Sequence, residues 1–319
     1  MSNKNVNWSD EKWKEMIIKQ RVFLWSEDAI EAYSKWLGLR QGMRVADIGC
    51  GLGYLGYTYW KYFGNNGHYI GIDINEDLLK DAKATSPNWA IGGTAEFIQG
   101  DVYKIPLPDN SVDMVMCQTL LMHLKNPEHA LAEMKRILKP GGILMCKEPD
   151  NISGMTSRRD SSSEDRSIEY EVLSFKLTLI AYKGSISLGR GDTSIGIRVP
   201  KMLSDLGFKS IDMRANENVH LLLPPYETKK QRYSFEQLKE RINKNEETKE
   251  KERQFWKERF KEEYLAGGGA LEELQQFEKM VEEEREKNEA ILKDQVKKRI
   301  YHSCGGNLFF IIKGIKNFD

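Results

Sequence analysis

The chain has 319 residues, of which 40% are hydrophobic and 30% are charged. Lys and Arg together number 48, as do Asp and Glu, so the formal net charge is zero. This balance gives no support for a nucleic-acid-binding protein or a polybasic membrane protein. No apolar run approaches the roughly 18–20 residues of a membrane-spanning helix, and the first ten residues lack the apolar core of a signal peptide.

The cysteines and histidines indicate neither a disulfide framework nor a metal site. The 4 cysteines are widely spaced and form no CxxC pair, and the 5 histidines lack the spacing of metal ligands. We therefore expect reduced, mostly buried thiols, no metal, and a cytoplasmic location.

Residues 8–41 are expected to be helical, because Trp13, Ile17 and Phe23 repeat at helical spacing. From residue 42 to residue 147, short apolar runs alternate with helix-length stretches. This alternation is typical of a parallel sheet with helices on both faces. The expected strands are Arg44–Ile48, Tyr69–Ile72, Glu96–Ile98, Val112–Cys117 and Ile143–Lys147.

The alternation breaks between residues 151 and 196, which we interpret as a segment inserted into a core of residues 43–227. A polar stretch there precedes an apolar, helix-like segment, Tyr170–Tyr182. The alternation resumes with a helix over Ile197–Leu206, stopped by Gly207, and a strand near Ile211–Leu223.

Residues 228–300 have a different composition, with 19 Lys or Arg and 18 Asp or Glu. Two sparse apolar stripes flank Gly267-Gly268-Gly269, which predicts two long helices in an αα-hairpin. The hairpin is interpreted either as a solvated structural insertion or as a lid or docking arm, and homodimerisation through it stays open. In residues 301–319, the apolar run Asn307–Ile315 predicts a final strand that returns to the core sheet.

The segment VADIGCGLG, residues 45–53, carries the chemistry. An expected strand delivers Asp47 to its carboxyl end, and Gly49, Gly51 and Gly53 follow. Glycine lets the chain turn sharply and lets backbone amides approach a ligand without an intervening Cβ atom. A helix beginning near Tyr54 would add its positive N-terminal end. The segment therefore indicates a loop that binds a small ligand.

The same glycines fit a second class of protein, the dinucleotide-binding enzymes. Gly51, Gly53 and Gly56 satisfy the pattern GxGxxG, and Asp73 stands 22 residues after Gly51, as a ribose-binding acid does in either class. Asp47 argues against this reading, because a carboxylate before the glycines would repel a pyrophosphate. An NAD-dependent oxidoreductase is therefore the less favoured alternative.

Two more motifs follow, Gly100-Asp101-Val102 and Pro106-Leu107-Pro108-Asp109. With Asp47, the glycine loop and Asp73, they resemble the class I S-adenosylmethionine-dependent methyltransferases, in particular the ubiquinone/menaquinone-biosynthesis type. The likeness covers residues 43–150 well, and 197–223 with 307–315 more loosely. It implies an α/β fold with a Rossmann-like, doubly wound seven-stranded sheet whose final strand is antiparallel. Residues 1–42 would form an N-terminal helical cap.

The resemblance also implies which residues bind the cofactor S-adenosylmethionine and its product S-adenosylhomocysteine. The methionine part would lie on the glycines with its ammonium near Asp47, and the ribose hydroxyls would donate to the Asp73 carboxylate. The adenine would pack on Ile74 and bond Asp101. The full expected set is Asp47, Gly49, Gly51, Gly53, Asp73, Ile74, Asp101, Val102 and Gln118, with Trp25 and Tyr33 of the cap as further candidates. For Asp73 or Asp101 alone, helix capping is the alternative.

No catalytic residue is assigned firmly, and three residues are candidates. His123 could act as a general base or satisfy backbone groups at a helix start. Glu148 and Asp150 end the fifth expected strand, where they could bind substrate, act as a base or cap a loop. For Cys50, within the glycine loop, packing explains a small residue.

The resemblance implies methyl transfer by in-line displacement, in which proximity and orientation supply most of the catalysis. The apolar stretch Phe175–Tyr182 suggests a small, partly apolar metabolite as acceptor, and the sequence leaves C-, N- and O-methylation open. A non-catalytic scaffold that binds the cofactor and uses the hairpin to hold a protein partner is the main alternative.

Overall fold

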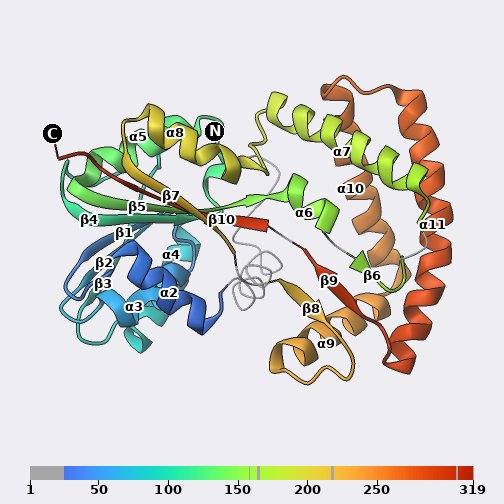
Figure 1. The fold of residues 1–319 in the computed structure, drawn as a ribbon, viewed down its shortest axis with the longest axis horizontal. Coiled ribbons are helices and arrows are strands. Elements are labelled where there is room, and N and C mark those ends of the chain that lie inside the picture. Colours follow the sequence, from blue (N-terminus) through green and yellow to red (C-terminus); the bar gives the residue numbers. More distant parts are fainter. Residues whose placement is uncertain (1–24, 158, 164–165, 217–218, 307, 319) are drawn as a thin grey trace. The chain divides into compact units, whose positions relative to one another are not determined.

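The computed structural model describes residues 25–157, 159–163, 166–216, 219–306 and 308–318 (Figure 1). Half of the expected helix over residues 8–41, namely residues 8–24, and Asn307 of the expected final strand lie outside the described residues. The chain divides into two units. The first comprises residues 25–150, 194–216 and 308–318, and the second comprises residues 151–193 and 219–306.

The first unit is built on a seven-stranded sheet in the order β3-β2-β1-β4-β5-β10-β7. β10 is antiparallel to β5 and to β7, and β1 to β5 pair in parallel. This confirms the expected α/β fold and the return of the final strand. The strands are β1 Arg44–Ile48, β2 His68–Asp73, β3 Thr94–Gln99, β4 Val112–Gln118, β5 Leu138–Asp150, β7 Lys209–Ala215 and β10 Leu308–Ile315.

The strand expected near Ile211–Leu223 is in fact two strands in different sheets. β7 ends at Ala215, and His220–Leu222 forms β8 in a sheet of the second unit. Asn216 closes the pairing with β10, since its amide donates to the Phe309 carbonyl at 2.8 Å and its Oδ1 accepts from the Phe309 amide at 2.8 Å. Because β10 is antiparallel to both neighbours, β7 runs in the direction of β5, and only β10 is antiparallel.

Helices cover both faces of this sheet (Figure 1). On one face, α5 (Pro127–Ile137) and α8 (Val199–Asp205) pack Leu131, Met134 and Leu203 into an apolar cluster. On the other, α2 (Glu27–Leu37) and α3 (Tyr54–Phe63) contribute Leu37 and Tyr59 to a second cluster. The unit also contains α4 (Glu76–Thr85) and the 3₁₀ turns Ser86–Asn88, Leu121–His123 and Ile195–Arg198. Apolar side chains thus pack against both faces of the sheet and hold the parallel strands, with their carboxyl ends, in place.

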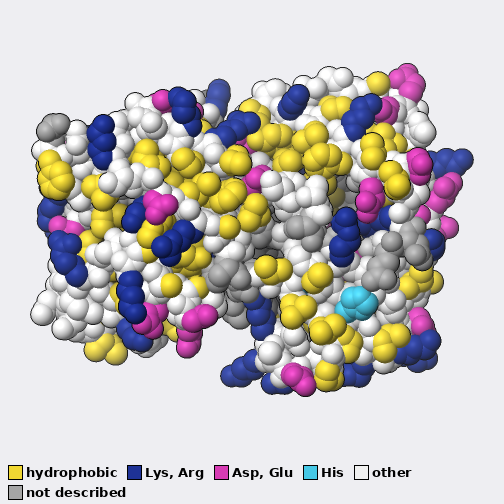
Figure 2. Space-filling model, in the orientation of Figure 1, with side chains coloured by type: hydrophobic (Ala, Val, Ile, Leu, Met, Phe, Trp, Pro, Cys, Tyr) yellow, Lys and Arg dark blue, Asp and Glu magenta, His cyan; other side chains and the backbone are white. Residues whose placement is uncertain are grey.

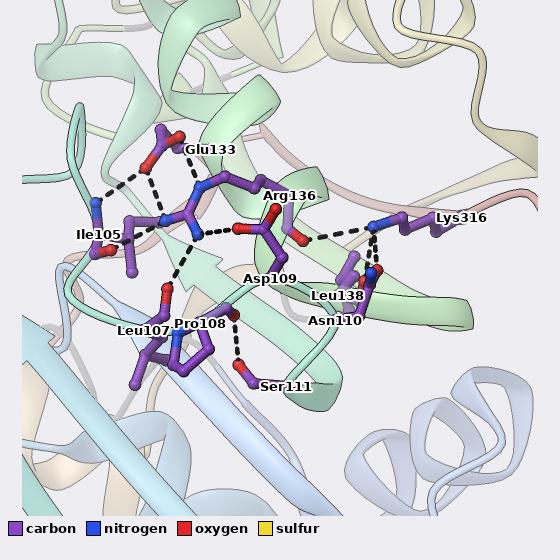
Figure 3. Close-up of polar contacts among 10 residues, drawn as sticks. All are labelled: Ile105, Leu107, Pro108, Asp109, Asn110, Ser111, Glu133, Arg136, Leu138 and Lys316. Atoms are coloured by element: carbon purple, nitrogen blue, oxygen red, sulfur yellow. Dashed lines mark hydrogen bonds and ion pairs between the residues drawn. The ribbon is translucent and has the colours of Figure 1, made fainter.

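Arg136 fixes the loop between β3 and β4 (Figure 3). Its guanidinium donates to the carbonyl oxygens of Ile105 and Leu107 and to the carboxylates of Asp109 and Glu133 at 2.7–2.9 Å. The motif Pro106-Leu107-Pro108-Asp109 therefore has a structural use, because it presents the Leu107 carbonyl and the Asp109 carboxylate to one arginine, next to the Ile105 carbonyl.

The second unit is mostly helical. Its helices are α6 (Asn151–Ser157), α7 (Ile168–Ser187), α9 (Lys229–Asn243), α10 (Glu246–Ala266) and α11 (Leu271–Lys298), and β6 (Arg159–Asp160), β9 (Ser303–Gly305) and β8 form a small sheet. The sequence predicts two helices over residues 228–300, whereas the structure has three. Lys244 leaves the helical conformation and Asn245 is extended. The Asn245 side chain accepts from the Thr248 amide at 2.7 Å, so a new helix begins at Glu246.

Glycines allow α7 and α10 to pack backbone against backbone. A Cβ atom added at Gly184 would lie 1.7 Å from the Glu263 carbonyl oxygen, and one added at Gly267 would lie 2.0 Å from that of Ile180. The contact therefore requires glycine at both positions. Among the described residues, no helix is both long enough and apolar enough to cross a membrane.

Candidate cofactor site

The glycine loop follows β1 and leads into α3. Gly49, Gly51 and Gly53 have φ angles of 69°, 51° and 74°, a region that favours glycine. The Gly49 amide donates to the Ile72 carbonyl at 2.7 Å, which holds the loop against β2. A Cβ atom at Gly49 would lie 2.7 Å from Leu120 Cδ1, whereas at Gly51 it would meet no atom within 4 Å. The loop thus presents bare backbone to open space at Gly51.

Asp73 lies at the end of β2, next to this loop. Its Oδ2 accepts from the Gly51 amide at 2.8 Å, and its Oδ1 accepts from the Asn75 amide at 2.9 Å. Burial raises the pKa of the Asp73 carboxyl, against the opposing effect of these backbone hydrogen bonds. The two acceptor oxygens are therefore fixed in direction by the loop that they join.

Asp47 is only 1% exposed and is bonded to a tyrosine of the neighbouring strand. The Tyr69 hydroxyl donates to Asp47 Oδ2 at 2.6 Å. Burial, followed by the negative charge of Asp47, raises the pKa of Tyr69, so the phenol remains a donor. Sequence reasoning missed Tyr69, although a residue with a polar tip inside an apolar strand is a usable signal.

Gln118 ends β4 and is 3% exposed. Its Oε1 accepts from Trp25 Nε1 at 3.1 Å, while its Nε2 is buried and has no hydrogen-bond partner among the described residues. A small cavity lies beside it, lined by Asp47, Gly49, Cys50, Tyr54, Leu55 and Gln118. A ligand with an acceptor atom in this cavity would satisfy a donor whose burial otherwise costs free energy.

The expected adenine-binding residues follow β2 and β3. The Ile74 side chain is 61% exposed, an apolar surface next to Asp73. Asp101 is exposed and its Oδ1 accepts from the Tyr103 amide at 2.9 Å, while Val102 packs against the core. The Gly100 amide donates to the Asp73 carbonyl at 3.0 Å, so the two strand ends are joined. The structure thus brings Asp73, Ile74 and Asp101 onto adjacent strand ends.

The two candidates of the cap differ in what they contact. Trp25 reaches Gln118, as described, and its ring lies edge-on to Tyr59 with centroids 5.3 Å apart. Tyr33 is 5% exposed, and its hydroxyl donates to the Ala215 carbonyl at 3.2 Å, at the end of β7. Trp25 is therefore the cap residue that the structure joins to the cavity.

The three catalytic candidates are placed differently. Glu148 is fully buried, and its carboxylate accepts from the amides of Leu120 and Leu121 at 2.9 Å and of Met122 at 3.3 Å. These hydrogen bonds hold the turn that carries His123. Glu148 thus has the loop-capping role that the sequence left open for it. Asp150 is 4% exposed, at the end of β5.

Lys147 is a further residue that sequence reasoning missed. It pairs with Gln118 in the β4–β5 register, is fully buried, and its Nζ lies 3.4 Å from the centre of the Trp25 ring. The sequence feature that could have identified it is a charged residue inside an apolar strand. Cys50, by contrast, behaves as expected of a packing residue, because burial, followed by the charges of Asp47 and Asp73, raises the pKa of its thiol.

Parallel strands whose carboxyl ends carry a glycine loop, an acid at the end of β2 and another after β3 define a Rossmann-like, ligand-binding α/β class. Comparison with known proteins narrows the class. Residues 39–183 match the family model described as a methyltransferase domain. Residues 39–183 are therefore similar to a methyltransferase domain, over less than half of the chain.

Curated relatives agree with the family. The ubiquinone/menaquinone biosynthesis C-methyltransferase of Pseudomonas fluorescens is 38% identical over 125 residues, which is 39% of this chain and 47% of that protein. An uncharacterised methyltransferase of Schizosaccharomyces pombe is 37% identical over 115 residues, which is 34% of this chain and 41% of that protein. The chain thus spans less than half the length of these two relatives.

Among solved structures, a SAM-dependent methyltransferase from Aquifex aeolicus is 23% identical, with a TM-score of 0.40. The match covers 64% of this chain and 86% of that one.

Proposed function

We propose that the protein is an S-adenosylmethionine-dependent methyltransferase that moves a methyl group to a small, partly apolar metabolite. One observation supports cofactor binding above the others. The buried Gln118 Nε2 lacks a partner among the described residues, beside a cavity lined by Asp47 and Gly49. A donor left unpaired at a strand end is expected where a ligand completes the hydrogen bonding.

The residues present fit the cofactor. Gly51 offers backbone without a Cβ atom, Asp47 offers a buried carboxylate for an ammonium, and Asp73 offers acceptors for ribose hydroxyls. The exposed Ile74 side chain would lie on the adenine, with Asp101 and Val102 beside it. When bound, S-adenosylmethionine supplies an already activated methyl group on a sulfonium.

The protein's part in the reaction is mainly positional. Alignment of an acceptor with the methyl–sulfur bond can supply about 7–11 kcal/mol of the barrier. Glu148 contributes by holding the turn of Leu120–Met122, and His123 at the end of that turn stays a candidate base. An acid–base residue is needed only where the acceptor must lose a proton before the methyl group arrives.

The remaining proposals concern the setting. We propose a cytoplasmic location, because Cys50, Cys117, Cys146 and Cys304 are all free thiols. Residues 25–42, the described part of the expected cap, would cover the cofactor site. Residues 151–196 and 228–300 would supply the substrate side, with residues 228–300 as a lid or a dimer contact.

The test uses S-adenosylmethionine labelled in its methyl group, incubated with the full chain and a cell extract separated into small molecules and macromolecules. Label in a small molecule, lost in Asp73→Asn, supports the proposal. Label in protein alone contradicts the metabolite acceptor. Cofactor binding without any transfer favours the scaffold alternative, and binding of NADH alone favours the oxidoreductase.

A further inference from the structure

The second unit contains a hollow that the proposed methyltransferase function does not use. It has a volume of about 600 Å³ and lies among α9, α10 and α11. This is within the range of small-molecule sites, which is about 300–1,000 Å³. Its lining is Phe235, Lys239, Ile242, Asn243, Lys244, Glu246, Lys249, Lys293, Val296, Lys297 and Arg299.

The lining is strongly sorted by charge. Residues 228–300 are almost balanced, with 19 basic and 18 acidic residues, yet the hollow is lined by six basic residues and one acid, Glu246. Positive charges therefore gather around the hollow, although the segment as a whole is nearly neutral. Like charges at close range repel, so an anion in the hollow would relieve the repulsion. Figure 2 shows Lys and Arg side chains prominent around α9 and the C-terminal end of α11.

Neighbouring carboxylates neutralise only part of this charge. Lys239 pairs with Glu236, Lys244 with Glu252, Lys249 with Glu246, and Lys293 with Glu289, at 2.6–3.1 Å. Lys297 and Arg299 form no ion pair with any described residue. The Arg299 guanidinium instead lies over Phe235, 5.0 Å from the ring centre. Two cations thus remain for a ligand.

Apolar side chains complete the lining. Phe235 is 2% exposed and belongs to a cluster against which Ile242 and Val296 pack. Phe235 is also stacked on Tyr226, with ring centres 4.2 Å apart, so the partly buried Ile242 and Val296 offer the accessible apolar surface. Cations beside such a surface suit a ligand with an anionic group and an apolar body. Because several cations converge, a group with more than one negative charge fits better than a single carboxylate.

We propose that this hollow binds a small phosphorylated compound whose apolar part lies on Ile242 and Val296. The ligand is distinct from the methyl donor, because no residue of the hollow belongs to the glycine loop or to the strand ends around it.

The test is calorimetric titration of the full chain with inorganic pyrophosphate and with phenyl phosphate, at constant ionic strength. Lys297→Gln removes a cation that makes no ion pair, and Lys287→Gln is the matched control, an exposed lysine of the same helix outside the hollow. We expect saturable binding of both probes, weakened about tenfold in Lys297→Gln and unchanged in Lys287→Gln.

Val296→Thr, which keeps the side-chain shape, separates the two parts of the ligand. This variant should have a weaker affinity for phenyl phosphate and an unchanged affinity for pyrophosphate. Absence of saturable binding, or equal weakening in Lys297→Gln and Lys287→Gln, would overturn the site. Unchanged affinity of Val296→Thr for phenyl phosphate would overturn the apolar part of the proposal.

Discussion

The hydroxyl of Tyr69 donates a hydrogen bond of 2.6 Å to the carboxylate of Asp47, across the β1–β2 pair. Both side chains are buried, so neither has water as an alternative partner. Asp47, which precedes the glycine loop, is thereby held in one orientation, and the start of the loop is fixed with it. Tyr69 is a positioning residue in this account.

Replacement of Tyr69 by phenylalanine tests this role. Tyr69→Phe removes the donor and leaves a buried carboxylate short of one hydrogen bond, so the free energy of unfolding should fall by about 1–3 kcal/mol. Urea denaturation measures the change. Tyr57→Phe, at a tyrosine that is 58% exposed, is the control and should change stability by less than about 0.5 kcal/mol. Equal stability of Tyr69→Phe and the control would show that the bond contributes nothing.

Gly51 and Gly189 form a matched pair for testing the loop. Both have positive φ angles, 51° and 70°, and an added Cβ atom meets nothing within 4 Å at either. Gly51→Ala and Gly189→Ala should therefore each lose stability by roughly 1–2 kcal/mol through backbone strain. Only Gly51→Ala should weaken the binding of S-adenosylhomocysteine, by about tenfold or more, because the alanine methyl group would fill space that the ligand occupies. Equal affinities in the two variants would argue that Gly51 is a turn residue alone.

A substitution at Glu148 distinguishes a positioning role from a catalytic one. Glu148→Gln keeps the shape but replaces one acceptor oxygen by a donor facing a backbone amide, so stability should fall by about 1–3 kcal/mol. We expect a lower rate of methyl transfer with an unchanged pH profile, because the residue acts through the turn at Leu120–Met122. Loss of a titrating limb from the profile would instead identify Glu148 as the base. Asp150→Asn is the parallel variant for the other strand-end acid.

The pH dependence of ligand binding follows from Asp73. Burial raises the pKa of Asp73 above its ordinary value of 3.8, so its contribution to stability is greatest below pH 3.8 and is lost as the pH rises through the folded pKa. A ligand whose hydroxyls donate to the ionised carboxylate offsets that loss. The thermal shift produced by S-adenosylhomocysteine should therefore grow as the pH rises through this window. In Asp73→Asn the growth should disappear, and a shift that grows equally there would assign it to another group.

The sequence predicts the core of the fold because its signals are local. Arg44–Ile48 is found as predicted, and the other parallel strands differ by a few residues at their ends. The break between β7 and β8 was missed, since the Asn216–Phe309 pairing that ends β7 joins residues far apart in the chain. The division at Lys244–Asn245 was missed because two helices with the same charged composition look like one.

The site was predictable in residue type and less so in contacts. Asp47, Gly51 and Asp73 carry a spacing that the family shares, and the structure places them around one loop. The bond from Tyr69 to Asp47 and the burial of Lys147 under Trp25 depend on strand register, which no short motif encodes. Tyr33 illustrates the converse, because its position in the cap suggests a ligand contact while its hydroxyl bonds the Ala215 backbone.

The most direct measurement is calorimetric titration of the full chain with S-adenosylhomocysteine, with NADH as the competing ligand and Asp73→Asn as the variant. The account predicts micromolar binding of S-adenosylhomocysteine, no binding of NADH, and affinity reduced about tenfold or more in Asp73→Asn, since the carboxylate accepts from both ribose hydroxyls. A folded sample that binds NADH, or that binds neither ligand, would contradict the assignment of the glycine loop to a methyl donor.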